Sequence, residues 1–201
     1  FRKNNGIDDK PVIALVPGSR KQEISRLLPV MAKVADDYPG YRFIVAGVST
    51  FNSEFYQRFI GGKNIPIVYK QTYDLLRNSA AALVTSGTAT LETALLGVPQ
   101  VVCYRMSFTS ALLAWIVVRV KYISLVNLIL DKPAVKELIQ YKCTRSAVSE
   151  ELGRIIQDDT YRDKMLINYK ELRLKTGDHG ASGRAAQIIW QTVNKELPNT
   201  K

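Results

Sequence analysis

Five short apolar runs recur in the first half of the chain, and helical patterns separate them. Within residues 22–37, for example, Ile24, Leu27, Leu28 and Met31 follow the i, i+3, i+4, i+7 spacing of an amphipathic helix. Strands that alternate with helices in this way predict an α/β fold with a Rossmann-like, doubly wound parallel sheet. The expected strands are residues 11–16, 41–46, 65–69, 81–85 and 99–104, and the expected helices between them are residues 22–37, 51–60, 72–78 and 88–96.

The second half of the chain predicts a helical tail. After Asp131 the expected helices are residues 133–141, 144–157, 160–175 and 181–194. The chain divides into a linker at 1–10, a ligand-binding domain at 11–176 and a C-terminal loop and helix at 177–201. The pattern leaves open whether the last helix packs here or crosses to another domain. Because the chain begins with Phe1 rather than Met, we expect it to be a piece of a longer protein.

Two glycine-containing turns, at residues 16–20 and 85–92, carry the candidate chemistry. Each follows an expected strand and opens an expected helix, so its free backbone N–H groups favour an anion such as phosphate. In a doubly wound sheet both turns lie at the carboxyl ends of strands and can converge on one ligand. The candidate phosphate-binding residues are Gly18, Ser19, Arg20, Ser86, Gly87 and Thr88.

Polar side chains in and after the turns refine this prediction. The permanently charged fork of Arg20 suits a diphosphate, although a solvated arginine at a helix start is the alternative. Ser19 and Gln22 have the spacing of a capping box, and a hydroxyl cap at Ser86 or Thr88 is compatible with phosphate binding. Glu92 lies one helical turn after Thr88, where it can reach hydroxyls. A phosphate beside a polyol outlines a nucleotide or a nucleotide-sugar.

Three further polar residues are weaker candidates. Asn127 lies in the apolar stretch 124–130, where a buried amide needs partners and fixing a loop is one interpretation. Glu137 and Gln140 are expected one turn apart on a short helix, and as surface residues they would need no explanation. The first turn lacks the terminal Gly-Lys-Ser/Thr of a P-loop, which disfavours an NTPase. No G-x-G-x-x-G motif follows a strand, which disfavours a standard dinucleotide-binding site.

The net charge of +10 adds a preference for anionic partners. Residues 105–145 hold seven Lys/Arg against two Asp/Glu, which accounts for half of the excess. Within them the apolar segment 108–120, with Trp115 inside and Arg119 and Lys121 at its end, is either a buried core helix or a segment that dips into a membrane. No apolar run is long enough to span a bilayer.

Cysteine and histidine supply no catalytic or metal chemistry. The chain has two cysteines, which make no disulfide framework, and Cys103 in an apolar run fits a buried thiol in a reducing compartment. The single histidine, His179, lies in a glycine-rich loop, and no Cys/His spacing indicates zinc. We therefore assign no metal, no cofactor and no catalytic histidine.

Five motifs in order resemble the C-terminal half of the lipid-A-disaccharide synthases, GT-B glycosyltransferases of Gram-negative bacteria that act in lipopolysaccharide synthesis. The motifs are residues 17–24, 86–92, 102–106, 122–128 and 135–140, and the 180–186 segment also looks like the family's ending. The chain departs from the family at Val126, where proline is usual, and at 129–134, so acceptor or acyl contacts there are open. The resemblance implies the donor-binding half of a GT-B fold.

The resemblance also implies an activity: inverting, metal-independent transfer of 2,3-diacylglucosamine from UDP to 2,3-diacylglucosamine 1-phosphate. Arg20 would neutralise the UDP leaving group, Glu92 would hold the ribose and Gln140 would lie near the donor sugar. Asn127 matches a functionally important asparagine, and we group it with Arg20 as catalytic. The general base would lie in the N-terminal half, which this chain lacks, so the fragment alone is expected to be inactive.

Membrane contact and partners follow from the same resemblance. Phe108, Trp115, Arg119 and Lys121 would contact acyl chains or the anionic surface of the inner membrane, with the protein peripheral on the cytoplasmic side. A homodimer is left open, and no nucleic-acid partner is expected. The alternatives are another UDP-sugar enzyme of the GT-B fold, such as a UDP-N-acetylglucosamine 2-epimerase, and a basic module that binds nucleic acid without catalysis.

Overall fold

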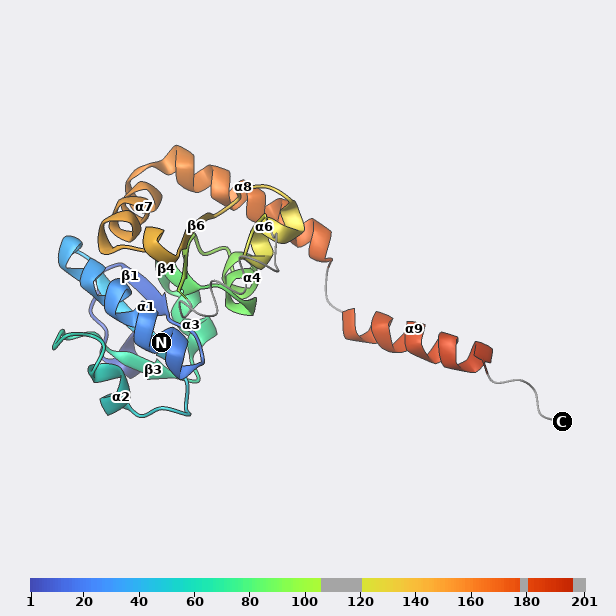
Figure 1. Cartoon of the computed structure of the whole chain (residues 1–201), viewed down its shortest axis with the longest axis horizontal. Coiled ribbons are helices and arrows are strands. Elements are labelled where there is room, and N and C mark those ends of the chain that lie inside the picture. The colour runs from blue at the N-terminus through green and yellow to red at the C-terminus, as the bar shows by residue number, and fades with distance from the viewer. Residues whose placement is uncertain (106–120, 178–180, 197–201) are drawn as a thin grey trace.

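The computed structural model describes residues 1–105, 121–177 and 181–196 (Figure 1). Its six strands form one parallel sheet in the order β3-β2-β1-β4-β5-β6. The strands are β1 (Val12–Val16), β2 (Arg42–Gly47), β3 (Ile67–Tyr69), β4 (Ser79–Thr85), β5 (Gln100–Tyr104) and β6 (Lys136–Ile139). The helices are η1 (Lys3–Asn5), α1 (Lys21–Val34), η2 (Ala35–Asp37), α2 (Ser53–Gln57), α3 (Thr72–Arg77), α4 (Thr88–Leu95), α6 (Leu125–Leu130), η3 (Gln140–Lys142), α7 (Arg145–Gln157), α8 (Asp159–Thr176) and α9 (Ala181–Glu196).

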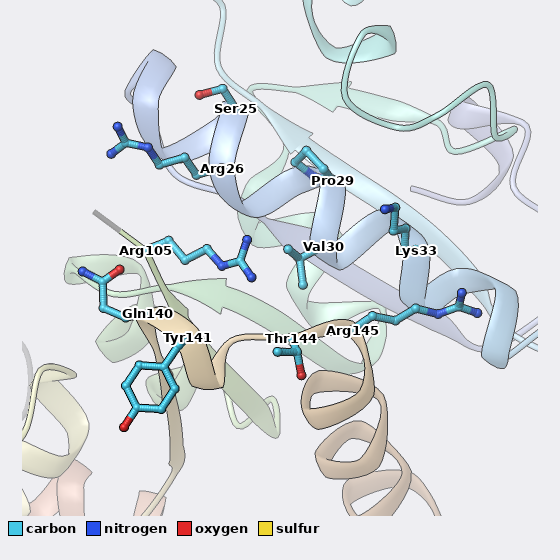
Figure 2. A pocket seen from close by; sticks show the side chains of 10 residues that line it. All are labelled: Ser25, Arg26, Pro29, Val30, Lys33, Arg105, Gln140, Tyr141, Thr144 and Arg145. Carbon is cyan, nitrogen blue, oxygen red and sulfur yellow. The ribbon is translucent and has the colours of Figure 1, made fainter. Parts of the chain in front are cut away.

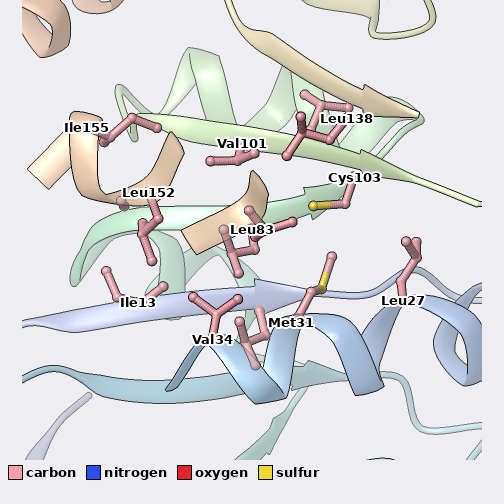
Figure 3. Close-up of a cluster of buried hydrophobic side chains, with 14 of the residues drawn as sticks. Ile13, Leu27, Met31, Val34, Leu83, Val101, Cys103, Leu138, Leu152 and Ile155 are labelled. Atoms are coloured by element: carbon pink, nitrogen blue, oxygen red, sulfur yellow. The ribbon is translucent and has the colours of Figure 1, made fainter. Parts of the chain in front are cut away.

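Both faces of the sheet are buried, which explains why its strands appear in the sequence as continuous apolar runs. Alternate residues of β1 belong to two clusters: Ile13 and Leu15 face one cluster, whereas Val12 and Ala14 face the other. Apolar residues of α1 and α7 cover the first face, including Met31 of α1 (Figure 3). Residues of α3 cover the second face. The predicted doubly wound α/β fold is therefore confirmed.

The predicted helix at 133–141 is wrong. Residues 136–139 form β6, which pairs in parallel with β5 from Val101↔Lys136 to Tyr104↔Ile139. Residues 140–142 form the 3-10 turn η3 instead of a continuing α-helix. A four-residue strand carries too little periodicity to be told from one helical turn, and the open edge of β5 decided between them.

Two segments outside the sheet take positions that the pattern did not specify. The linker expected at 1–10 is held against the domain, because Asp8 forms an ion pair with Arg42 at 2.6 Å. That ion pair lowers the pKa of the Asp8 carboxyl below its ordinary value. At the other end, α9 extends away from the sheet and its helices (Figure 1). Its residues Ile188, Ile189 and Trp190 are exposed.

The order of the strands predicts a crevice at the carboxyl ends of β1 and β4. The chain winds outward from β1 through β2 to β3, and then returns to β4, which lies on the other side of β1. Ligands of doubly wound sheets bind beyond the carboxyl ends of the strands at such a reversal. Both glycine-containing turns follow the two central strands, β1 and β4, so the fold brings them to this crevice.

Candidate functional site

A cavity of about 420 Å³ lies at the carboxyl ends of β1 and β4, and we call it the two-turn cleft. It brings together six of the residues that the sequence predicted for phosphate binding, and Thr72 of α3 and Val48 after β2 border it as well. The six residues are Gly18, Ser19, Arg20, Ser86, Gly87 and Thr88. The expected convergence of the two turns on one space is confirmed.

In the first turn, the hydrogen-bond donors that we expected to bind phosphate donate instead to a carboxylate of the chain itself, that of Glu23. The backbone N–H groups of Ser19 and Arg20 donate to Oε2 of Glu23 at 3.1 and 3.2 Å, and Nη1 of Arg20 donates to Oε1 at 2.8 Å. Gly18 has a φ of 103°, and an added Cβ there would lie 2.3 Å from Glu23 Oε2. The turn is therefore built around an anion, and Glu23 occupies that position.

This arrangement corrects the predicted capping box. The helix α1 begins at Lys21 with Arg20 as its N-cap, and Glu23 is the residue that bonds back to the cap backbone. Ser19 and Gln22 lie one position too early for that role. The hydrogen bond with Glu23 raises the pKa of Arg20, to which Tyr104 adds a smaller effect. The guanidinium thus stays charged while 81% of the side chain is exposed.

In the second turn, the hydroxyl cap expected from Ser86 or Thr88 is wrong. The N-cap of α4 is Gly87, with a φ of 146°, which has no side chain to cap the helix. The Ser86 hydroxyl instead donates to the carbonyl of Ile123 at 2.8 Å. The Thr85 hydroxyl, at the end of β4, is buried and has no hydrogen-bond partner among the described residues. Buried polar groups are usually satisfied, so Thr85 is consistent with a cleft built to hold something polar.

Glu92 lies on α4, half-buried, one turn beyond Thr88. It is not among the residues that border the two-turn cleft. A rise of about 1.5 Å per residue puts it ~6 Å further along the helix than Thr88. Its predicted contact with hydroxyls stays a prediction.

Asn127 is 1% exposed and holds a loop together. Its amide nitrogen donates to the Val135 carbonyl at 2.9 Å and to Glu137 Oε1 at 2.8 Å, while its amide oxygen accepts from the Val135 N–H at 2.9 Å. The side chain is fully used in fixing residues 127–135. The geometry therefore supports the loop-fixing interpretation and gives Asn127 no direct access to a ligand.

Glu137 is the residue that the sequence reasoning undervalued. On β6, and not on the expected helix, its carboxylate accepts from the N–H groups of Ile123 and Ser124 at 3.0 Å and from the Ser124 hydroxyl at 2.8 Å. Because Ile123 also accepts from Ser86, this carboxylate is linked to the second turn. An acidic residue between the apolar residues Val135 and Leu138 was the available signal.

Gln140 lies in a different cavity from the other predicted binding residues. This cavity, which we call the basic groove, has a volume of about 700 Å³ and lies between α1 and the 140–145 segment (Figure 2). Gln140 begins η3, again not the expected helix, and its φ is 53°. Arg105, which directly follows β5, also borders the groove. The groove and the two-turn cleft are both bordered by residues of α1, namely Arg26 and Glu23.

Three of the four predicted membrane contacts, Phe108, Trp115 and Arg119, lie outside the described residues, as does His179. The fourth, Lys121, is 65% exposed and forms an ion pair with Asp131 at 3.0 Å. That pairing raises the pKa of Lys121 above its ordinary value. Among the described residues, no helix combines the length and the apolar character needed to cross a bilayer. The same residues contain no cluster of three or more His, Cys, Asp or Glu that could hold a metal ion.

Comparison with known proteins gives a family-level match. The family described as lipid-A-disaccharide synthetase matches residues 1–189. A lipid-A-disaccharide synthase of Myxococcus xanthus (strain DK1622) is 36% identical over 200 residues, covering 96% of this chain and 52% of that protein. A second, from Rhodospirillum centenum (strain ATCC 51521 / SW), is 33% identical over 207 residues, covering 98% and 52%. The chain therefore spans about half the length of these curated relatives.

Solved structures share the fold at low sequence identity. WaaG, a glycosyltransferase involved in lipopolysaccharide biosynthesis, has a TM-score of 0.60 at 14% identity, covering 94% of this chain and 49% of that one. The UDP-GlcNAc 2-epimerase of Neisseria meningitidis bound to UDP-GlcNAc has a TM-score of 0.55 at 19% identity, covering 97% and 47%. These similarities support the GT-B type of α/β fold.

Proposed function

The chain belongs to the lipid-A-disaccharide synthetase family, and on this premise we propose that the two-turn cleft binds the UDP part of a nucleotide-sugar donor. The reaction it serves is transfer of 2,3-diacylglucosamine from UDP to 2,3-diacylglucosamine 1-phosphate, with inversion and release of UDP. The observation that carries the proposal is the meeting of both glycine turns and Arg20 in one cleft at the reversal of the sheet.

The chemistry of the leaving group fits these residues. Breaking the bond between sugar and diphosphate loads negative charge on UDP, and fixed donors that interact more strongly with that charge lower the barrier. One oriented donor of this kind is typically worth ~3 kcal/mol of transition-state stabilisation. In this proposal the diphosphate replaces the Glu23 carboxylate at the Ser19 and Arg20 N–H groups. Arg20 then pairs with UDP without help from a metal.

The remaining predicted residues have supporting roles. Glu92 would hold the ribose, and Gln140 would lie near the donor sugar. Asn127 acts here as a positioning residue, because its amide is already used in fixing the 127–135 loop and in orienting Glu137. Through Ile123 and Ser86, this network sets the shape of the second turn.

The acceptor pocket and the general base belong, in this proposal, to the half of the relatives that this chain does not span. We therefore expect this chain to bind UDP without forming disaccharide. Disaccharide synthesis by these 201 residues alone would refute that expectation. Because both substrates carry acyl chains, the whole enzyme would work at the cytoplasmic surface of the inner membrane. Its proposed contacts there are Phe108, Trp115, Arg119 and Lys121, and a homodimer stays open.

The direct test is UDP binding by calorimetry and by the shift of the melting temperature. UDP is expected to raise the melting temperature of the natural chain, and Arg20→Ala is expected to remove most of that shift. Arg58→Ala is the matched control, because Arg58 is also exposed but lies at the end of α2, outside the cleft. An equal loss in both variants, or no response to millimolar UDP, would count against the proposal.

An epimerase of the same fold is the second candidate, and the epimerase structure above favours it only at the level of fold. Such enzymes move protons and need side chains that titrate for that work. The only histidine, His179, lies outside the described residues. Mass spectrometry of the products made from UDP-GlcNAc by the longer parent protein separates the two candidates. Salt-sensitive binding of random DNA without UDP binding would instead favour the nucleic-acid module.

A further inference from the structure

Two buried thiols meet between β5 and the turn that follows β6. Cys103 lies on β5, and Cys143 directly follows η3. Both side chains are fully buried in the same apolar cluster, where Figure 3 shows Cys103, and both are free thiols. The Cys103 thiol donates a hydrogen bond to the Cys143 sulfur. The two sulfur atoms are therefore in direct contact, although the residues are remote in sequence.

The backbone around Cys143 holds this contact in place. Because β5 pairs with β6, Cys103 lies opposite Leu138 at the point where the chain approaches η3. Gln140 then has a φ of 53°, and its carbonyl accepts from the Cys143 N–H at 3.1 Å. On the other side, Nη2 of Arg105 donates to the Cys143 carbonyl at 2.6 Å. Both backbone groups of Cys143 are thus engaged, which keeps its side chain against the end of β5.

The surroundings of Cys143 favour its thiolate form. It directly precedes Thr144, the N-cap of the 13-residue helix α7, where the positive end of the helix dipole stabilises a negative charge. The hydrogen bond from Cys103 and, to a smaller extent, the charge of Arg105 lower the pKa of Cys143 to about 7, although burial opposes them. The same hydrogen bond and burial raise the pKa of Cys103. Cys143 can therefore supply a thiolate, while Cys103 keeps its proton.

Cys143 is covered by only a thin layer of protein. Its neighbours Tyr141, Lys142 and Thr144 are exposed, so Cys143 is a single buried residue within an exposed segment. Tyr141 and Thr144 also border the basic groove (Figure 2). A small movement of η3 is enough to admit a small oxidant to the Cys143 sulfur. Cys103 is more protected, because it lies within a strand of the sheet.

We propose that Cys103 and Cys143 form a redox-modification site, which a peroxide converts into a reversible disulfide. The Cys143 thiolate attacks one oxygen of hydrogen peroxide, so that an S–O bond forms, the O–O bond breaks and hydroxide leaves. The Cys103 thiol then attacks the oxidised sulfur, so that the S–S bond forms, the S–O bond breaks and the Cys103 proton leaves with the oxygen as water. The first hydroxide takes up the proton that Cys143 had released. Two electrons have then passed from the two sulfurs to the peroxide, which becomes two molecules of water.

The disulfide would join η3, which begins at Gln140, covalently to β5. A dithiol reductant restores the two thiols by thiol–disulfide exchange, so the change is reversible. In a reducing compartment the pair stays reduced until an oxidant appears, which is the behaviour of a redox-sensing cysteine pair. No step uses the two-turn cleft, so this site does not depend on the proposed function.

The test treats the whole chain, freshly reduced and freed of reductant, with hydrogen peroxide at pH 7. Peptides are then mapped by mass spectrometry without reduction. We expect the Cys103 and Cys143 peptides to be joined within one chain and to separate again after dithiothreitol. Cys103→Ala is expected to stop at a sulfenic acid on Cys143, which dimedone traps. Cys143→Ala is expected to leave Cys103 unmodified. The result for the natural chain decides the proposal even if a variant does not fold.

Arg105→Ala is expected to slow the oxidation about twofold, because loss of its charge raises the pKa of Cys143 and leaves less thiolate at pH 7. Arg26→Ala is the matched control, because Arg26 also borders the basic groove, whereas the charge that lowers the pKa of Cys143 is that of Arg105. Equal rates in these two variants would overturn the role given to Arg105.

Three results would overturn the proposal as a whole. The first is that both thiols stay free at a peroxide concentration that oxidises glutathione in the same tube. The second is that the disulfides join different chains rather than Cys103 to Cys143 of one chain. The third is that dimedone labels Cys103 in Cys143→Ala while Cys143 in Cys103→Ala stays unlabelled.

Discussion

Replacing Glu23 by glutamine is expected to tighten UDP binding while making the protein less stable. Glu23 holds the N–H groups of Ser19 and Arg20 and the Arg20 guanidinium, the same groups that the diphosphate would use. A ligand can bind them only after the carboxylate releases them. Glutamine keeps the size of the side chain but removes the charge that competes with phosphate.

The magnitude follows from the two backbone hydrogen bonds. A hydrogen bond to a charged group contributes ~1.5–3 kcal/mol when well formed, but these bonds are long, at 3.1 and 3.2 Å, and the Glu23 side chain is 21% exposed. We therefore assign ~1 kcal/mol to each, and about half of that is kept by a neutral acceptor. The net release of ~1 kcal/mol corresponds to about fivefold tighter UDP binding. The same loss lowers the melting temperature by ~2–4 °C for a chain of this size.

Calorimetry with UDP tests the expected gain in UDP affinity, and thermal unfolding of the same samples tests the expected loss of stability. Glu54→Gln is the matched control, because Glu54 also lies in the first turn of a helix but outside the two-turn cleft. The control should change UDP affinity less than twofold, by our order-of-magnitude expectation for a remote surface charge. UDP affinity that falls or stays constant in Glu23→Gln would show that Glu23 does not compete with the ligand.

Two further substitutions test the supporting structure. Asn127→Ala should lower the free energy of unfolding by ~3 kcal/mol in chemical denaturation, because the N–H and the carbonyl of Val135 lose their side-chain partner and Glu137 loses one of its donors. A loss under ~1 kcal/mol would contradict the role of Asn127 in fixing the 127–135 loop. Asp37→Asn should cost less than ~1 kcal/mol at pH 7, because the hydrogen bond from Arg145 lowers the pKa of this partly exposed carboxyl. The stability that this lowered pKa contributes is present above the unfolded pKa of about 3.9, and it is lost as the pH falls through the lower folded pKa. The melting temperatures of the natural chain and the variant should therefore converge as the pH falls below about 4.

Much of the fold and the outline of the site could be predicted from local sequence. Residues 11–16 and 81–85 read as strands because both faces of a parallel sheet are buried. Small residues at Gly18 and Gly87 marked the turns because each has a positive φ that other residues rarely adopt. These features are encoded within a few neighbouring residues, so no knowledge of distant contacts was needed.

The predictions that were wrong concern residues whose structure depends on partners far away in the sequence. Residues 136–139 became a strand because β5 offered an open edge, and Glu137 became a hub because Ser124 and Asn127 reach it from another segment. The two glycine turns were recognisable one at a time, but their sharing of one cleft depends on β1 and β4 being neighbours.

The sequence by itself determined the alternation of strands and helices, the two glycine-containing turns after strands and the excess of positive charge. Only the tertiary structure decided that Glu23 occupies the first turn, that Asn127 is used in fixing a loop, and that Arg26 and Arg105 border one groove. The physical reason is range: backbone preferences and periodicity act over a few residues, whereas hydrogen-bond partners and shared cavities are set by where the folded chain places remote segments.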